Sequence, residues 1–152
     1  MLWEEYKSEF KPDGFLRDLL IKDVDIKDWH SVIHFLKSTH AMLEFFIDGR
    51  QAPLPHDFAT VINDPSHDYL LSVNLGGVDM NCPMNAADQI ELVFDPVMID
   101  DEFKANLIFR LMSTIGRTLD KPVYCSHTDE NRHPVFEYKP GHTVEYLSSL
   151  KN

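Results

Sequence analysis

Residues 69–82 read YLLSVNLGGVDMNC, and they indicate an antiparallel sheet. Apolar side chains at Leu71, Val73 and Leu75 alternate with polar ones, and the alternation resumes at Val78 after two glycines. A period of two residues is typical of a strand with one buried face. A glycine pair accepts the positive φ angles that a two-residue turn requires, so the stretch predicts a β-hairpin.

Further strands are predicted on both sides of this hairpin, where short apolar runs end at turn residues. They cover residues 15–21, 42–47 and 89–94, with two or three more at 123–125 or beyond, 135–138 and 143–147. Short runs joined by tight turns favour antiparallel pairing over a parallel sheet, which needs long crossover connections.

Two long amphipathic helices are predicted between these strands. In the first, Ile26, Trp29 and Val32 begin an apolar stripe that ends near residue 38, and Asp23 and Asp25 stand ready to cap it. The second covers residues 100–119, with an apolar residue at every fourth position from 103 to 119 and three acids at its start.

These elements predict an α+β fold in which a mostly antiparallel sheet of about six to seven strands packs with two main helices. We find no repeat and no Gly/Ser linker, so residues 1–152 are expected to form a single domain. Residues 1–12 are predicted to be an N-terminal arm or a short helix, which stops at the turn sequence Pro12-Asp13-Gly14.

The charge of the chain restricts its partners. There are 14 Lys and Arg residues against 25 Asp and Glu, so the formal net charge is −11. Such a protein has no general attraction for nucleic-acid phosphate or an anionic membrane, and a basic protein is the expected partner. The first residues lack the pattern of a secretory signal and no run is long enough to span a bilayer, so a cytoplasmic protein is expected.

Common catalytic motifs do not occur in the sequence. There is no G-x-G-x-x-G, G-x-x-x-x-G-K-[ST], G-x-S-x-G or H-E-x-x-H pattern. The two cysteines, Cys82 and Cys125, form no CxxC pair and are expected to be reduced, buried thiols. We therefore expect a protein that is not an enzyme and holds no cofactor.

Histidines supply the best remaining candidates for a chemical site. His30 and His34 lie four residues apart on the first helix, so both rings point the same way, but nothing nearby completes a metal site. Cys125 and His127 share one side of a strand, and His133 follows. A thiol and an imidazole in contact can form an activated nucleophile, although a buried free cysteine beside a loop histidine is the commoner arrangement.

Several segments between residues 14 and 147 carry a family resemblance. They are Gly14-Phe15-Leu16-Arg17-Asp18 with Asp28-Trp29, Phe46-Ile47-Asp48-Gly49 with Pro53-Leu54-Pro55, residues 91–96 before a long helix, Ile115-Gly116-Arg117 through Lys121-Pro122-Val123, and Val135-Phe136-Glu137-Tyr138. This layout resembles the small immunity proteins that bacteria carry beside polymorphic or contact-dependent toxins.

The resemblance implies an inhibitor with no active site of its own, which neutralises a cognate toxin domain by covering its active surface. A nuclease toxin must be basic to hold phosphate, so a charge of −11 suits such a partner. The predicted binding face consists of acids near loops: Asp79, Asp100, Asp101, Glu102, Asp129 and Glu130.

Two other functions remain open from the sequence. One is a small metal- or thiol-dependent enzyme that uses Cys125, His127 and His133. The other is an acidic adaptor for basic proteins, which can work near micromolar affinity, whereas an immunity protein needs a Kd near nanomolar or below.

Overall fold

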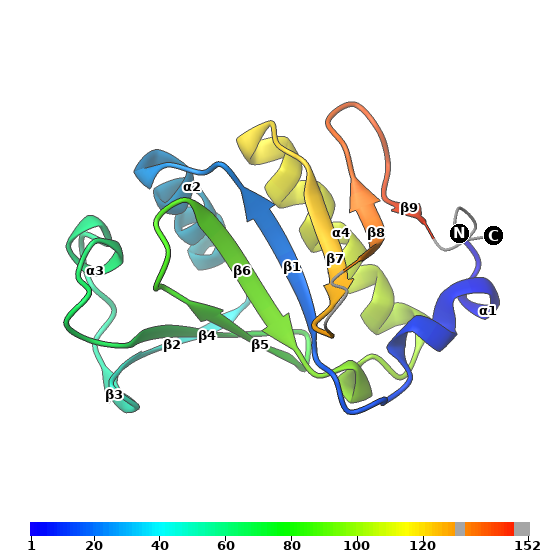
Figure 1. Cartoon of the computed structure of the whole chain (residues 1–152), viewed down its shortest axis with the longest axis horizontal. Coiled ribbons are helices and arrows are strands. Elements are labelled where there is room, and N and C mark those ends of the chain that lie inside the picture. Colours follow the sequence, from blue (N-terminus) through cyan, green and yellow to red (C-terminus); the bar gives the residue numbers. More distant parts are fainter. Residues whose placement is uncertain (130–132, 148–152) are drawn as a thin grey trace.

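A computed structural model describes residues 1–129 and 133–147. These residues form an antiparallel sheet of nine strands in the order β3-β2-β4-β5-β6-β1-β7-β8-β9 (Figure 1). The strands are β1 (Arg17–Lys22), β2 (Met42–Ile47), β3 (Arg50–Ala52), β4 (Tyr69–Leu75), β5 (Val78–Pro83), β6 (Gln89–Phe94), β7 (Val123–His127), β8 (Pro134–Tyr138) and β9 (Glu145–Tyr146).

Two long helices, α2 (Ile26–Ser38) and α4 (Glu102–Leu119), contact each other on one face of the sheet, behind it in Figure 1. The shorter helices are α1 (Trp3–Tyr6) and α3 (Ala59–Ile62), and two 3₁₀ turns, η1 (Lys7–Phe10) and η2 (Pro96–Met98), complete the described elements. None of the helices in the described residues has both the length and the apolar character needed to cross a bilayer.

The α+β class and the antiparallel sheet are confirmed, but the predicted number of strands and helices is too low. The β3 strand was not predicted, because its three residues show no apolar alternation and none of them is fully buried. The first strand begins at Arg17 and not at residue 15, which leaves Phe15 and Leu16 in the preceding loop.

The central hairpin has the predicted turn. Leu75 of β4 pairs with Val78 of β5, and the two glycines between them have φ angles of 59° and 85°. A β-carbon added to Gly76 would lie 2.6 Å from a methyl group of Leu107, so the turn packs closely against α4.

Acidic side chains begin both long helices, as predicted. Asp25 accepts a hydrogen bond from the Asp28 amide at 2.9 Å, and Asp28 accepts one from the Asp25 amide at 3.1 Å, which forms a capping box. Asp101 accepts from the Lys104 amide at 2.8 Å at the start of α4. These bonds satisfy backbone donors that have no partner within the helix.

The N-terminal arm packs on the rest of the chain through aromatic side chains. Tyr6 and Phe10 are only 1% and 3% exposed. The Tyr6 ring contacts Phe109 and Phe136 edge-on at centroid distances of 5.3 and 5.6 Å, and Phe10 stacks on Phe136 at 5.6 Å. The arm therefore belongs to the hydrophobic core that α4 and β8 share.

Gly116 offers a test of the packing between α4 and β8. A β-carbon at this helical position would overlap the Tyr138 ring and lie 3.1 Å from the Lys121 carbonyl oxygen. We expect Gly116→Ala to lower the free energy of unfolding by about 1–3 kcal/mol, although alanine favours helix, because the ring has to shift. Urea unfolding measures this change.

The matched control is Thr118→Ala at an exposed position of the same helix, which we expect to leave stability unchanged or slightly raised. A Gly116→Ala protein as stable as the wild type would contradict the packing described here.

Candidate functional site

One end of the sheet gathers most of the acids predicted to bind a partner. The last row of paired residues at this end consists of Met80 of β5, Phe94 of β6, Arg17 of β1 and His127 of β7. Asp79 precedes this row and Asp129 follows it. The η2 turn and the start of α4, with Asp100, Asp101 and Glu102, come directly after β6. All five therefore lie at the same end, at the lower edge of the sheet in Figure 1.

Several of these carboxylates already have partners within the chain. Asp79 accepts a hydrogen bond from Asn74 at 2.5 Å, Asp100 lies 3.0 Å from the Lys104 ammonium, and Asp101 caps α4. Glu102 is exposed at the first position of the helix. The sixth predicted acid, Glu130, lies outside the described residues. Glu102 is therefore the clearest surface charge of the predicted face.

A buried arginine organises the backbone at this end of the sheet. Arg17 is 1% exposed, and its guanidinium donates two parallel hydrogen bonds of 3.1 Å to the carboxylate of Asp13. It also donates to the carbonyl oxygens of Glu9 at 2.9 Å, Lys11 at 3.2 Å and Phe15 at 2.9 Å. We call this arrangement the Arg17 clamp; it ties η1 and the loop at residues 11–16 to the start of β1.

The Arg17 clamp holds two large apolar side chains in solvent. Phe15 and Leu16 are 47% and 45% exposed, although their backbone is fixed. The Phe15 amide donates to Asp13 at 3.0 Å, and the Leu16 carbonyl accepts from the amide and the hydroxyl of Thr128 at 3.0 and 3.1 Å. The two side chains are therefore presented on a rigid loop.

A cleft of about 360 Å³ lies between this loop and η2. Its walls are residues 12–16 on one side and Asp95, Pro96 and Val97 on the other, and Val97 is 57% exposed. Among the residues that line it, Asp13 and Asp95 are the charged ones. We call Phe15, Leu16 and Val97 the apolar patch.

A neighbouring cleft on the other side of Pro96 and Val97 has a volume of about 410 Å³. Trp3, Ile99 and Phe10 contribute apolar walls, while the charged residues are Lys7, Lys11 and Asp100. The apolar surface thus continues from one cleft to the next. The charged residues of the first cleft, Asp13 and Asp95, are both acidic, whereas the second cleft has charges of both signs.

The Cys125 and His127 pair does not have the properties of an activated nucleophile. Cys125 is fully buried, and burial raises the pKa of its thiol far above the usual value. Burial likewise raises the pKa of Cys82 to about 12. The two cysteines form no disulfide and are buried, as predicted, and both thiols are in the neutral form at physiological pH.

His127 belongs to the surroundings of the Arg17 clamp. Its ring lies 3.7 Å from the carboxylate of Asp13 and 4.0 Å from that of Glu9. Burial, followed by the charge of Arg17, lowers its pKa, so the ring is neutral near pH 7. His133 is exposed before β8, and no three metal-binding side chains come together in the described residues.

The two histidines of α2 do not form a metal site with other residues that the structure describes. His30 lies 3.4 Å from Asp57, and both His30 and His34 are exposed on α2. Both histidines therefore lie on the solvent side of the helix, away from the core.

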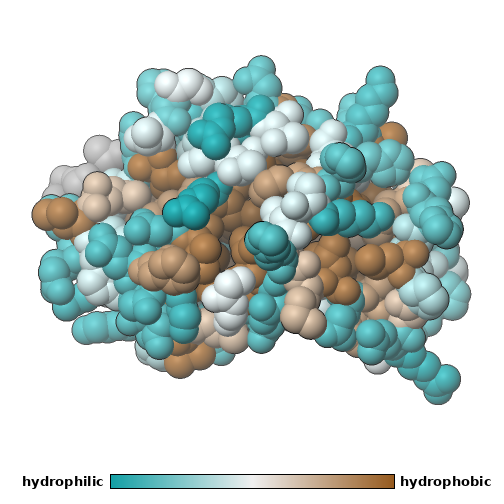
Figure 2. Space-filling view, turned by 180° about the vertical axis from the view of Figure 1, so that it is seen from behind, coloured by the Kyte–Doolittle hydropathy of each residue, from teal (hydrophilic) through white to brown (hydrophobic). Residues whose placement is uncertain are grey.

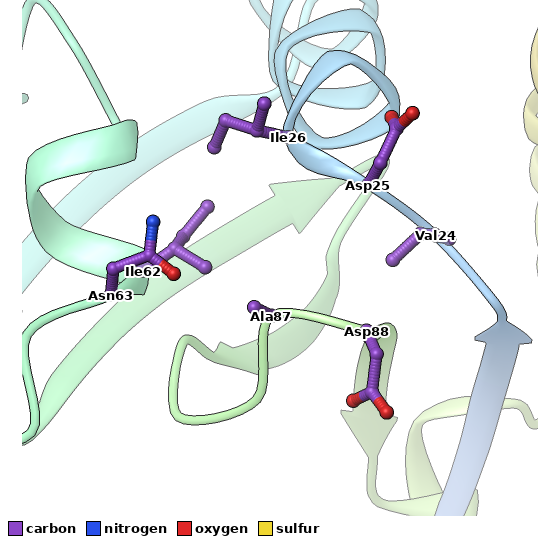
Figure 3. Close-up of a pocket in the computed structure, with 7 residues that line it drawn as sticks. All are labelled: Val24, Asp25, Ile26, Ile62, Asn63, Ala87 and Asp88. Carbon is purple, nitrogen blue, oxygen red and sulfur yellow. The ribbon is translucent and has the colours of Figure 1, made fainter.

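Two other hollows have mostly apolar walls. One, of about 170 Å³, lies between the start of α2, α3 and the β5–β6 loop, and Figure 3 shows Asp25 and Asp88 at its margin with their carboxylates turned away from it. The other is a groove of about 220 Å³ between α2 and α4, lined by Phe35, Leu75 and Leu107 among others. Figure 2 shows this helical face hollowed near its middle between apolar surfaces.

Comparisons with protein-family models, with curated proteins and with solved structures find no match for this chain. The resemblance to immunity proteins therefore stays a prediction.

Neither the Arg17 clamp nor the apolar patch is predicted by the sequence pattern. Residues 15–21 read FLRDLLI, which looks like a strand with two charges in its middle. The one signal was this charged pair, because a charged residue inside an apolar strand needs a buried partner. Its partner, Asp13, lies in a segment that reads only as a turn.

The Arg17 clamp can be tested with Asp13→Asn. The bonds from Arg17 lower the pKa of Asp13, so this carboxylate stabilises the fold above about pH 3.8 and the effect is lost as the pH falls through its folded-state pKa. We expect the variant to lose about 1–3 kcal/mol near pH 7, less than for a fully buried pair because the Asp13 side chain is 41% exposed.

Urea unfolding at several pH values measures this loss. The difference in stability between wild type and variant should become smaller in acid. Asp95→Asn is the matched control, because Asp95 accepts a hydrogen bond from the amide two residues on, as Asp13 does, at the same 3.0 Å. Equal losses in the two variants would show that the ion pair with Arg17 contributes nothing.

Thiol alkylation tests the catalytic alternative. We expect neither Cys82 nor Cys125 to react with iodoacetamide in the folded protein, and both to react once guanidinium chloride unfolds it, because burial keeps the thiols protonated and covered. Mass spectrometry of the two peptides separates the sites. Thr118→Cys, at an exposed position, provides a reactive control; fast alkylation of Cys125 in the folded protein would restore the enzyme hypothesis.

Proposed function

We propose that the protein is an immunity protein, an inhibitor without enzymatic activity that binds a basic toxin domain in the cytoplasm and covers its active surface. A nuclease domain is the kind of toxin that its charge suits best. The observation that carries the proposal is that exposed acids lie at the same end of the sheet as the apolar patch, whose backbone is held by hydrogen bonds.

This arrangement combines two contributions to protein binding. The acids, with a formal charge of −11 over the whole chain, attract a basic surface and speed its association. The apolar patch can be covered by a partner, and desolvated apolar side chains at the centre of an interface supply most of the affinity. Because the loop is already fixed, little conformational entropy is lost when it binds.

Two alternatives differ from this proposal in ways that can be checked. Both thiols are buried with raised pKa values, which opposes a thiol-dependent enzyme. An acidic adaptor would use the same surface, and its weaker affinity for several partners distinguishes it from an inhibitor of one toxin.

The proposal is tested by titrating the protein with the C-terminal domain encoded by the gene immediately upstream, at two salt concentrations. We expect one-to-one binding with a Kd near nanomolar or below, weakened by salt because exposed charges are screened. Glu102→Gln should weaken it by about 1 kcal/mol, roughly fivefold, if this acid faces the partner.

Asp120→Asn is the matched control, because it removes one charge at the other end of the same helix. The 18 residues of α4 put these positions about 27 Å apart. Asparagine also tolerates the left-handed conformation of Asp120, whose φ is 53°. Absence of binding by the wild type, or equal effects of the two variants, would argue against an inhibitor that works through this end of the sheet.

A further inference from the structure

We propose that the apolar patch is the anchoring part of the binding surface, and that it takes a protein segment with an apolar side chain next to a Lys or Arg. The apolar side chain would enter the cleft between residues 12–16 and η2, and the basic group would meet Asp13 and Asp95 at its walls. This inference deepens the proposed function, because it names the anchor and the chemistry of the partner segment.

The first support is where the exposed apolar side chains lie. Within residues 1–129 and 133–147, the large hydrophobic residues with exposed side chains are Met1, Leu2, Phe15, Leu16, Met42, Val97 and Phe103. Met1 and Leu2 precede α1, Met42 begins β2 and Phe103 lies in the first turn of α4, whereas Phe15, Leu16 and Val97 line one cleft. A gathered and exposed apolar surface with polar groups around it is typical of an interaction site.

The second support is that the surface is formed before a partner arrives. The backbone of Phe15 and Leu16 is held by bonds from Arg17 and Thr128, and the carboxylate of Asp95 accepts from the Val97 amide at 3.0 Å. Both walls of the cleft therefore have a fixed shape. A preformed cleft loses little conformational entropy when a partner binds. Residues that dominate the binding energy of an interface are found in well-packed pockets of this kind.

Charge determines which occupant fits best. The charged side chains in the cleft are Asp13 and Asp95; Arg17 offsets part of the first charge, while the cationic residues Lys7 and Lys11 line the neighbouring cleft. A second copy of this chain would bring a formal charge of −11 toward another −11, which opposes self-association. A basic segment of a different protein is complementary both to the two carboxylates of the cleft and to the net charge of the chain.

The test is a selection of displayed random peptides on the full-length protein, followed by titration of the enriched peptides made synthetically. We expect the enriched peptides to combine an apolar residue with Lys or Arg. Phe15→Ser should weaken their binding by about tenfold or more, because it removes an anchor. Asp95→Asn should weaken it by about twofold to fivefold and reduce its dependence on salt.

Met42→Ser is the matched control, since it removes an apolar side chain that is more exposed than Phe15, 68% against 47%, from β2, the second strand of the sheet and not part of the cleft. Its effect should stay within about twofold. Melting curves of all variants check that each one folds. The inference is overturned if no peptides are enriched, if they lack basic residues, or if Phe15→Ser leaves binding unchanged. Self-association of the wild type that Phe15→Ser abolishes would likewise overturn it in favour of a second copy.

These outcomes are separate from those of the toxin-domain titration, because the peptides are not taken from that domain. Tight binding of the toxin domain together with a failed selection would leave the proposed function standing without this anchor. Enriched basic peptides without toxin binding would support the anchor and contradict the toxin as its partner.

Discussion

The buried guanidinium of Arg17 is the constraint that joins the N-terminal arm to the sheet. Its bonds reach the backbone of η1, the carboxylate of Asp13 and the loop before β1. Without them a buried charge would be left with unpaired donors, which costs several kcal/mol. The position of the N-terminal arm, which brings Tyr6 and Phe10 into the core, and the shape of the loop that carries Phe15 are therefore coupled.

This coupling explains why the apolar patch is stable in solvent. Packing alone would favour Phe15 and Leu16 inside and Arg17 outside, since long charged residues are seldom fully buried. The chain does the reverse: Arg17 and Asp18 are 1% and 2% exposed, while the two apolar residues before them are nearly half exposed. The backbone bonds of the Arg17 clamp compensate the buried charge, and they hold the loop in place.

The parts of the fold that repeat a simple period were predictable from the sequence. The alternation around Gly76 and Gly77 predicted the central hairpin, and the spacing of four from Phe103 onward predicted α4. The β3 strand has no such period, because it lies at the edge of the sheet and buries little. The Arg17 clamp depends on contacts of one side chain with backbone groups up to eight residues away, and no period in the sequence encodes them.

The buried thiol of Cys125 and the exposed apolar patch lie at different points along the same part of the sheet. Cys125 and Leu19 pair across β7 and β1 on the face that the helices cover, and there the thiol is a packing group with a raised pKa. Two residues before Leu19, the strand meets the Arg17 clamp, and beyond it the chain turns its apolar side chains outward. A buried ion pair adds little net stability compared with apolar packing. Its main physical consequence here is a fixed apolar surface beside Asp13 and Asp95, which is the kind of surface that the proposed function requires.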